Sequence, residues 1–235
     1  GKADFTAIDH INFRLYPGET LGIVGESGSG KSTLARAITR LTDATEGTIS
    51  LCGEDITREK GKKLREAYKN IQMIFQNPVS SFDPRKSLGH GIGESLRNSG
   101  VPKEEAKKRV LELLGQCGLP KEFYDRYPHE VSGGQCQRAA IARALAVKPK
   151  IVICDEATSA LDVTVQQQIM ELLDSFRKEH QISYLFICHN LALVQQFCDR
   201  VLVMKDGRIV EEGTPDEVIL NPRDEYTKML VESVF

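Results

Sequence analysis

The sequence predicts an α/β fold with a mostly parallel sheet, and three observations support this class. Short apolar runs, each as long as a buried strand, recur along the chain. Amphipathic helix patterns lie between some of these runs, and strands that alternate with helices are joined by right-handed crossovers that leave them parallel. Asp206 and Gly207 lie between two extended segments and are typical of a hairpin, so we expect one antiparallel β edge.

Apolar runs define the expected strands, which are residues 20–25, 70–76, 150–155, 183–189 and 200–207. The clearest helix pattern covers residues 163–180. Its apolar residues recur at helical spacing and share one face: Val165, Ile169, Leu172, Leu173 and Phe176. The spacing therefore predicts an amphipathic helix.

The middle of the chain, residues 85–148, carries helix patterns and no strand pattern. One helix is expected within 102–118, with Pro102 at its first position and Gly118 just past its end. Its apolar stripe is Ala106, Val110, Leu113, Leu114 and Cys117. We therefore expect one domain over 1–235, in which an α/β core formed by 1–84 and 149–235 carries an inserted helical subdomain, 85–148.

Composition excludes several classes of protein. Apolar residues are 40% and charged residues 27% of the 235, an ordinary globular mixture. The net charge of −2 gives no basic surface, so no nucleic-acid partner is expected. The six cysteines lack zinc-site spacing and are expected to be reduced thiols of a cytoplasmic protein. No apolar run approaches the ~20 residues of a membrane span, and no secretion signal is visible.

A glycine-rich segment, GESGSGKST, joins the first expected strand to a helix pattern. Gly25, Gly30, Lys31 and Ser32 have the spacing of a phosphate loop, in which backbone N–H groups and a helix N-terminus surround phosphate oxygens. Lys31 is expected to reach the β- and γ-phosphates of a nucleoside triphosphate, and Ser32 to ligate Mg²⁺. The residues assigned to this ATP-type site are Gly25, Glu26, Ser27, Gly28, Ser29, Gly30, Lys31, Ser32 and Thr33.

Polar residues follow three other expected strands. Ligands of open α/β sheets bind at the carboxyl ends of strands, so Asp155 is expected near Ser32, holding Mg²⁺. Glu156 is placed to orient a water beside the γ-phosphate or to accept its proton. His189 is expected to bond the γ-phosphate and position that water, although a lone histidine is more often structural. The amide oxygen of Gln76 could reach the metal or the attacking water, but this residue alone does not distinguish a functional role from a structural one.

The segment HEVSGGQCQRAAIARAL begins another helix pattern. Ser132 and Gln135 have the spacing of a capping box, so a well-capped helix would by itself explain this stretch. Gly133 and Gly134, however, expose a second helix N-terminus, which favours an anion.

Taken in order, these motifs resemble the ATP-binding subunits of ABC transporters. The matching elements are GESGSGKS, the glutamine of FQNP, VSGGQ, IVICDE, SALD and the histidine of CHN. The resemblance covers nearly the whole chain. The signature motif usually begins with leucine and begins here with Val131, a change of apolar size that puts little in doubt.

The resemblance implies a head-to-tail pair of ATP-binding subunits, the same chain or a homologous one, with two ATPs sandwiched between them. By that analogy the signature residues Ser132, Gly133, Gly134 and Gln135 contact ATP bound to the partner, and Asp162 lies at the dimer interface. Gln76 would sense Mg²⁺ and face the permease, and NPVSSFDPRKSLGHGI would receive a coupling helix. Members also stack adenine on an upstream aromatic residue, for which Phe5 is the one available.

GESGSGKST, FQNPVSSFDPR and NPRDEYTKML resemble the dipeptide, oligopeptide and nickel importers of this family. The resemblance implies an ATPase whose cofactors are ATP and Mg²⁺ and whose hydrolysis drives import of a small solute, a peptide or nickel. It also implies a peripheral subunit on the cytoplasmic face of the membrane, with transmembrane permease subunits and an extracellular solute-binding protein as partners.

Two other functions are compatible with parts of the pattern. One is a soluble ABC ATPase that acts on ribosomes or DNA, although such proteins usually carry two ATPase units in one chain or long coiled coils. The other is a module that binds ATP without hydrolysing it, against which the intact set of Lys31, Asp155, Glu156 and His189 argues.

Overall fold

The computed structural model describes residues 6–234. Its strands are β1 (Thr20–Val24), β2 (Ser50–Leu51), β3 (Glu54–Asp55), β4 (Ile71–Ile74), β5 (Ile151–Asp155), β6 (Ser183–Ile187), β7 (Arg200–Lys205) and β8 (Arg208–Gly213). Its α-helices are α1 (Lys31–Ile38), α2 (Gly61–Asn70), α3 (Leu88–Ile92), α4 (Glu94–Asn98), α5 (Lys103–Gln116), α6 (Gly133–Leu145), α7 (Val163–His180), α8 (Leu191–Phe197), α9 (Pro215–Leu220) and α10 (Glu225–Glu232). Three 3₁₀ turns are η1 (Val79–Ser81), η2 (Lys121–Tyr124) and η3 (Pro128–Glu130).

The main sheet has the strand order β4-β5-β6-β1-β7-β8. The strands from β4 to β7 pair in parallel, and only β8 pairs antiparallel to its neighbour β7. Asp206 and Gly207 both have positive φ angles, 49° and 75°, in the turn between β7 and β8. The predicted fold class, a mostly parallel sheet with an antiparallel edge, is therefore confirmed.

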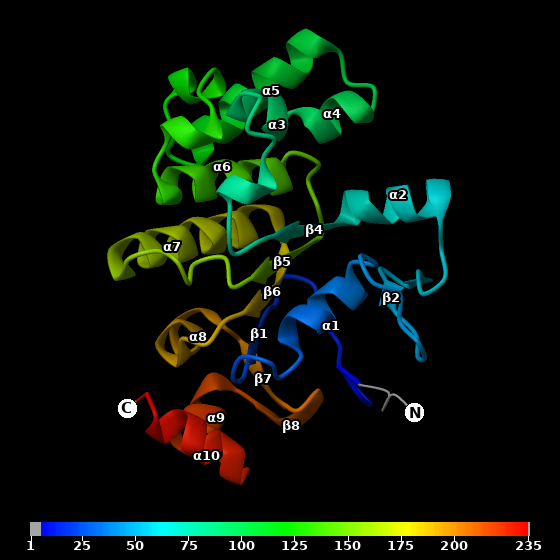
Figure 1. Cartoon of the computed structure of the whole chain (residues 1–235), viewed down its shortest axis with the longest axis vertical. Helices are drawn as coiled ribbons and strands as arrows, with labels where there is room; N and C mark the ends of the chain where they lie inside the picture. The colour runs from blue at the N-terminus through cyan, green and yellow to red at the C-terminus, as the bar shows by residue number, and fades with distance from the viewer. Residues whose placement is uncertain (1–5, 235) are drawn as a thin grey trace.

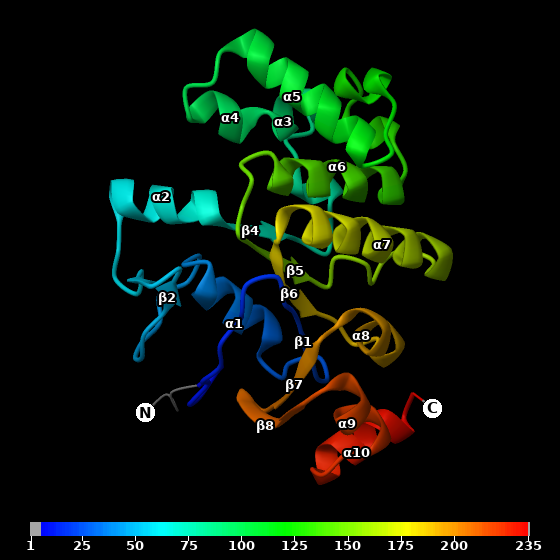
Figure 2. The ribbon, with the colours of Figure 1, turned by 180° about the vertical axis from the view of Figure 1, so that it is seen from behind.

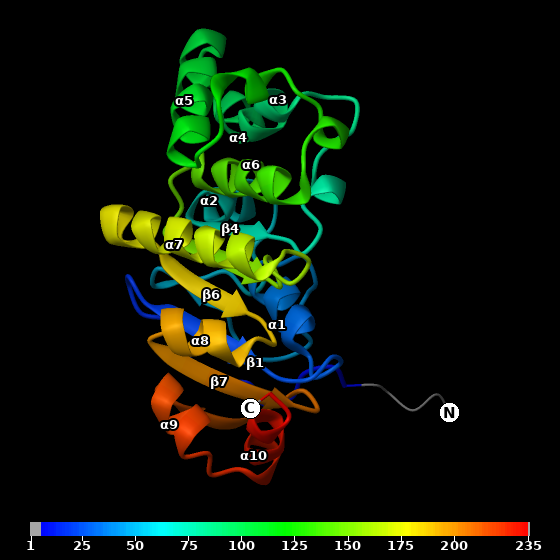
Figure 3. The same cartoon turned by 90° about the vertical axis from the view of Figure 1, so that its left-hand side faces the viewer.

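The sheet is covered by helices on both faces. Because side chains alternate along a strand, Leu21 and Ile23 of β1 belong to one apolar cluster and Val24 belongs to the other. Helices α7 and α8 lie on one side of the strands and α1 on the other (Figures 1 and 2). Helices α3 to α6 lie together at one end of the molecule, and α9 and α10 lie at the opposite end (Figure 3).

Between β4 and β5 the described chain forms helices only, from η1 to α6. The boundaries 85–148 of an inserted helical subdomain stay a prediction. None of the helices in residues 6–234 has the length and apolar character that crossing a membrane requires.

The helix predicted from the 163–180 pattern coincides with α7, whose Ile169, Leu173 and Phe176 are buried. Val165 and Leu172 are partly buried. On α5, Ala106, Val110 and Leu114 are buried, as is Cys117 at its C-cap, whereas Leu113 is partly buried.

The prediction that Pro102 is the first helical residue of α5 is wrong by one position. Pro102 has a ψ of 145°, which is not helical, and its carbonyl accepts the first intrahelical bond from the Ala106 N–H at 2.8 Å. It is therefore the N-cap. At the other end Gly118 has a φ of +72°, and the N–H groups of Gly118 and Leu119 close the helix on Gly115 and Leu114.

Candidate nucleotide-binding site

The parallel strands bring three polar segments to one edge of the sheet. Ile23 of β1 and Asp155 of β5 both pair with Ile187 of β6, so these three strands end at the same level. The chain leaves this edge at Gly25, at Glu156 and at His189, which stands two residues beyond Ile187. The structure thus places most of the predicted site residues beside one another.

The glycine-rich loop leads directly into α1, which begins at Lys31 after Gly30 as N-cap. The Lys31 ammonium donates to the carbonyls of Gly25 (2.7 Å) and Glu26 (2.9 Å) and to Ser29 Oγ (3.3 Å). Lys31 is 4% exposed. Its burial lowers the pKa of the ammonium, and the nearby carboxylates of Glu156 and Asp155 oppose that shift.

The β7–β8 hairpin supports the glycine-rich loop through a backbone hydrogen bond. The Gly207 N–H donates to the Ser29 carbonyl at 2.9 Å, and the Gly207 carbonyl accepts from the Asp9 N–H at 2.8 Å. A Cβ at Gly25 would lie 2.2 Å from the Met204 carbonyl oxygen. Gly25 and Gly207, which lie far apart in the sequence, therefore both allow the loop and the hairpin to approach each other closely.

Gly207→Ala is expected to destabilise the protein by about 1–3 kcal/mol more than Gly53→Ala does. Both residues have positive φ, +75° and +84°, so both substitutions carry the strain of a left-handed alanine. Only at Gly207 would the new Cβ meet backbone, the Ala7 carbonyl oxygen at 2.6 Å, whereas nothing lies within 4 Å at Gly53. Urea unfolding of the two variants measures the difference, and equal midpoints would contradict the close approach of Ala7 to the hairpin at Gly207.

Ser32 and Asp155 form the side-chain contact that joins the loop to β5. The Ser32 hydroxyl donates to Asp155 Oδ1 at 3.0 Å. Burial raises the pKa of Asp155, and the Ser32 hydrogen bond partly offsets it. Both groups offer hard oxygen atoms, the donors that Mg²⁺ prefers. Within residues 6–234 no three His, Cys, Asp or Glu side chains are grouped so that they alone could hold a metal ion.

Glu156 and His189 face each other at the same edge, with Glu156 Oε1 and His189 Nδ1 3.9 Å apart. The His189 side chain is 63% exposed and the Glu156 side chain 24%. Glu156 has a left-handed backbone with φ of +50°, held by its N–H, which donates to the Ile187 carbonyl at 2.9 Å. Strained backbone of this kind clusters at functional sites.

Gln76 leaves the sheet at the end of β4, which pairs in parallel with β5 so that Ile74 lies opposite Cys154. It is exposed, and two strands, β5 and β6, separate β4 from β1. Within the described residues no hydrogen bond links Gln76 to Ser32 or Asp155. Its predicted role toward the metal stays a prediction, and Phe5 lies outside the described residues.

The signature residues form the predicted capping box at the start of α6. Ser132 Oγ accepts from the Gln135 N–H at 3.2 Å, and Gln135 Oε1 accepts from the Ser132 N–H at 2.9 Å. No hydrogen bond in the described chain joins this turn to the phosphate loop of the same subunit. A Cβ at Gly134 would lie 2.9 Å from Val165 Cγ1, so the starts of α6 and α7 adjoin. Asp162, which caps α7 through the Val165 N–H at 3.0 Å, is beside them.

Sequence reasoning missed one residue that touches the loop. Tyr226 of α10 accepts a hydrogen bond from the Glu26 N–H at 2.8 Å. Because 200 positions separate the two residues, no local pattern signals this contact.

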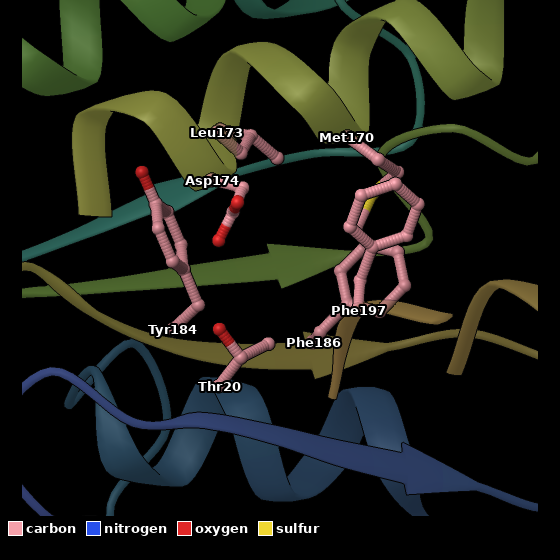
Figure 4. A pocket seen from close by; sticks show the side chains of 7 residues that line it. All are labelled: Thr20, Met170, Leu173, Asp174, Tyr184, Phe186 and Phe197. Atoms are coloured by element: carbon pink, nitrogen blue, oxygen red, sulfur yellow. The ribbon is translucent and has the colours of Figure 1, made fainter. Parts of the chain in front are cut away.

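An internal cavity lies on the α7 side of the sheet (Figure 4). Its lining comes from β1, β6, α7 and α8: Thr20, Met170, Leu173, Asp174, Tyr184, Phe186 and Phe197. Thr20 and Tyr184 lie at the amino ends of their strands, opposite the phosphate-loop edge. A volume of about 10 Å³ holds no more than one water, so this cavity is not a nucleotide site.

Known proteins resemble the chain over nearly its whole length. The family model described as ABC transporter matches residues 8–159. The oligopeptide transport ATP-binding protein OppF of Salmonella typhimurium is 49% identical over 230 residues, which is 97% of this chain and 69% of that protein. The glutathione import ATP-binding protein GsiA of Salmonella choleraesuis is also 49% identical, over 97% of this chain and 37% of its own.

Solved structures share the fold. The dimeric structure of MJ0796, a bacterial ABC transporter cassette, has a TM-score of 0.84 and 30% identity, covering 92% of this chain and 93% of its own. The cbiO1 structure from Clostridium perfringens has a TM-score of 0.82 and 32% identity, and the match covers 92% of this chain and 84% of that chain.

Proposed function

Since the chain belongs to the ABC transporter family, we propose that it is the ATP-hydrolysing subunit of a peptide importer. One observation carries the chemical part of this proposal: the hydrogen bond of 3.0 Å between Ser32 and Asp155, which joins a phosphate loop to the end of a second strand. Relatives named for transport of oligopeptides and of glutathione, itself a tripeptide, support a peptide as cargo. Neither of these two relatives is named for nickel, the other cargo considered.

The site residues divide into those that bind ATP and those that act on water. Lys31 and the loop N–H groups would hold the phosphates, with Ser32 and Asp155 holding Mg²⁺. Magnesium would supply neutralisation of the phosphate charge as the leaving group departs. Glu156 would accept a proton from the attacking water, and His189, 3.9 Å from it, would orient that water and the γ-phosphate.

The signature turn supports a second subunit in the complete site. Ser132 and Gly133 are exposed at the N-terminus of α6, and within residues 6–234 no hydrogen bond joins this turn to the phosphate loop of its own chain. A helix N-terminus attracts phosphate, so we assign this turn to the ATP of a head-to-tail partner and the adjacent Asp162 to the interface between the two subunits. The dimeric form of the MJ0796 cassette supports that arrangement.

The segment after Gln76 is the surface that we assign to the permease, at the cytoplasmic face of the membrane. It exposes Val79, and Phe75, just before Gln76, is exposed as well. The partly buried Arg143 of α6 ties it to the signature helix, since its guanidinium donates to the Ser81 carbonyl and to Ser81 Oγ (2.9 Å) and lies 4.3 Å from the Phe82 ring centroid. A displacement of this segment would therefore reach the helix that begins at Ser132.

The test is co-purification of the tagged chain from membranes of its native host. We expect permease subunits to be recovered with the wild type and with Val234→Asp, and to be lost with Val79→Asp. The two valines are 47% and 42% exposed, so the variants differ in position rather than in burial. Recovery of ribosomes or DNA in place of permeases would overturn the transporter assignment in favour of a soluble ABC ATPase, which no observation here favours.

A further inference from the structure

The start of α10 is fixed to strand β8. The Glu211 carboxylate accepts hydrogen bonds from the backbone N–H groups of Arg223 (2.9 Å) and Asp224 (3.0 Å). The Glu211 side chain is 4% exposed, so water does not compete for these bonds. Asp224 then caps the helix by accepting from the Tyr226 N–H at 2.8 Å. These backbone contacts therefore fix the position of Tyr226 independently of the contacts of its side chain.

The Tyr226 side chain reaches from α10 to the phosphate loop. Its ring is buried, with 5% of the residue exposed, and the Lys205 ammonium lies 5.1 Å from the ring centroid. Its hydroxyl oxygen accepts from the Glu26 N–H at 2.8 Å. Loss of the hydroxyl would remove the acceptor of this N–H, at a hydrogen bond that is partly buried.

Glu26 is held on both sides of its backbone. Its N–H is bound by Tyr226, and its carbonyl accepts from the Lys31 ammonium at 2.9 Å and from the Ser29 N–H at 3.2 Å. One residue thus links the last helix of the chain to the lysine that we assign to the phosphates. A loop fixed in this way before ATP arrives loses less conformational freedom on binding.

We propose that Tyr226 is a positioning residue of the nucleotide site. It acts through the Glu26 N–H and makes the affinity for ATP depend on how α10 packs against β8. The inference rests on the proposed function, because it presumes that the loop binds ATP. Tyr226 does not touch the reacting atoms. Its contribution therefore belongs to binding, and the rate at saturating ATP does not depend on it.

Tyr226→Phe removes the hydroxyl and keeps the ring. We expect the Kd for Mg-ATP, measured by titration calorimetry, to rise about tenfold, equivalent to about 1.4 kcal/mol. KM should rise with it while kcat stays within about twofold of wild type. Tyr184→Phe is the matched control, since Tyr184 is 3% exposed and its hydroxyl has no hydrogen-bond partner among the described residues. This control should leave both the Kd and KM unchanged.

Folded Tyr226→Phe protein with wild-type affinity would overturn the inference while leaving the proposed function intact. Wild-type protein that fails to bind ATP would overturn both. Hydrogen exchange in the wild-type chain covers the case in which Tyr226→Phe does not fold. The Glu26 amide should be protected before nucleotide is added, and a freely exchanging Glu26 amide would exclude the contact.

Discussion

Glu156→Gln is expected to lower the rate of ATP hydrolysis by about 10²–10⁴-fold and to leave the Kd for Mg-ATP near the wild-type value. Glutamine keeps the size of the side chain at the edge of the sheet but cannot accept a proton from water. The backbone at position 156 has a φ of +50°, which glutamine adopts as readily as glutamate, so the fold should be unaffected. Steady-state turnover and calorimetric binding measure the two quantities separately. Hydrolysis at the wild-type rate would remove Glu156 from the mechanism.

The same variant tests the assignment of the signature turn. With hydrolysis blocked, Mg-ATP should hold two subunits together, which light scattering detects as a doubled mass. Adding Gly134→Asp would bring a negative charge into the turn assigned to the partner's phosphates, and its Cβ, 2.9 Å from Val165 Cγ1, would also displace that turn, so the dimer should be abolished. Gly115→Asp on α5, where nothing lies within 4 Å of a new Cβ, is the control and should keep it. A dimer that survives Gly134→Asp would contradict the signature assignment.

Lys31→Ala should weaken Mg-ATP binding by at least about 100-fold, equivalent to about 2.7 kcal/mol. The substitution removes the one cation that the loop encloses, and hydrogen bonds to a charged group are worth about 1.5–3 kcal/mol each. It also leaves the Gly25 and Glu26 carbonyls without their donor, so the empty loop should loosen.

Lys178→Ala, at an exposed position on α7, is the control for loss of one positive charge. Affinity in Lys31→Ala within about threefold of this control would contradict the role given to the loop. Calorimetry with Mg²⁺ present makes the comparison.

The sequence was most informative where structure is local. The five predicted strands and α7 follow from apolar runs and helical spacing, and the phosphate loop from a fixed spacing of glycine, lysine and serine. Asp155 could be placed near Ser32 because parallel strands end at one edge of a sheet. β2 and β3 gave no signal, since two-residue strands depend on backbone pairing alone.

The remaining features depend on contacts between distant segments. The turn at Gly207 was predicted, but its support of Ser29 was not, because nothing near either residue encodes their meeting. The Tyr226–Glu26 bond joins the two ends of the chain. The left-handed backbone of Glu156 is imposed by its bond to β6 and has no signature in a side chain that rarely adopts it.

The Arg143 contact gives α6 the geometry of a lever. Eleven residues of helix separate Arg143 from Ser132, so the signature turn lies about 16 Å from the point at which Ser81 and Phe82 hold the helix. A tilt of about 10° about that point would move the turn by about 3 Å, the length of one hydrogen bond. A small rotation at the surface that we assign to the permease would thus be enough to make or break the contacts that we propose between the signature turn and the partner's nucleotide.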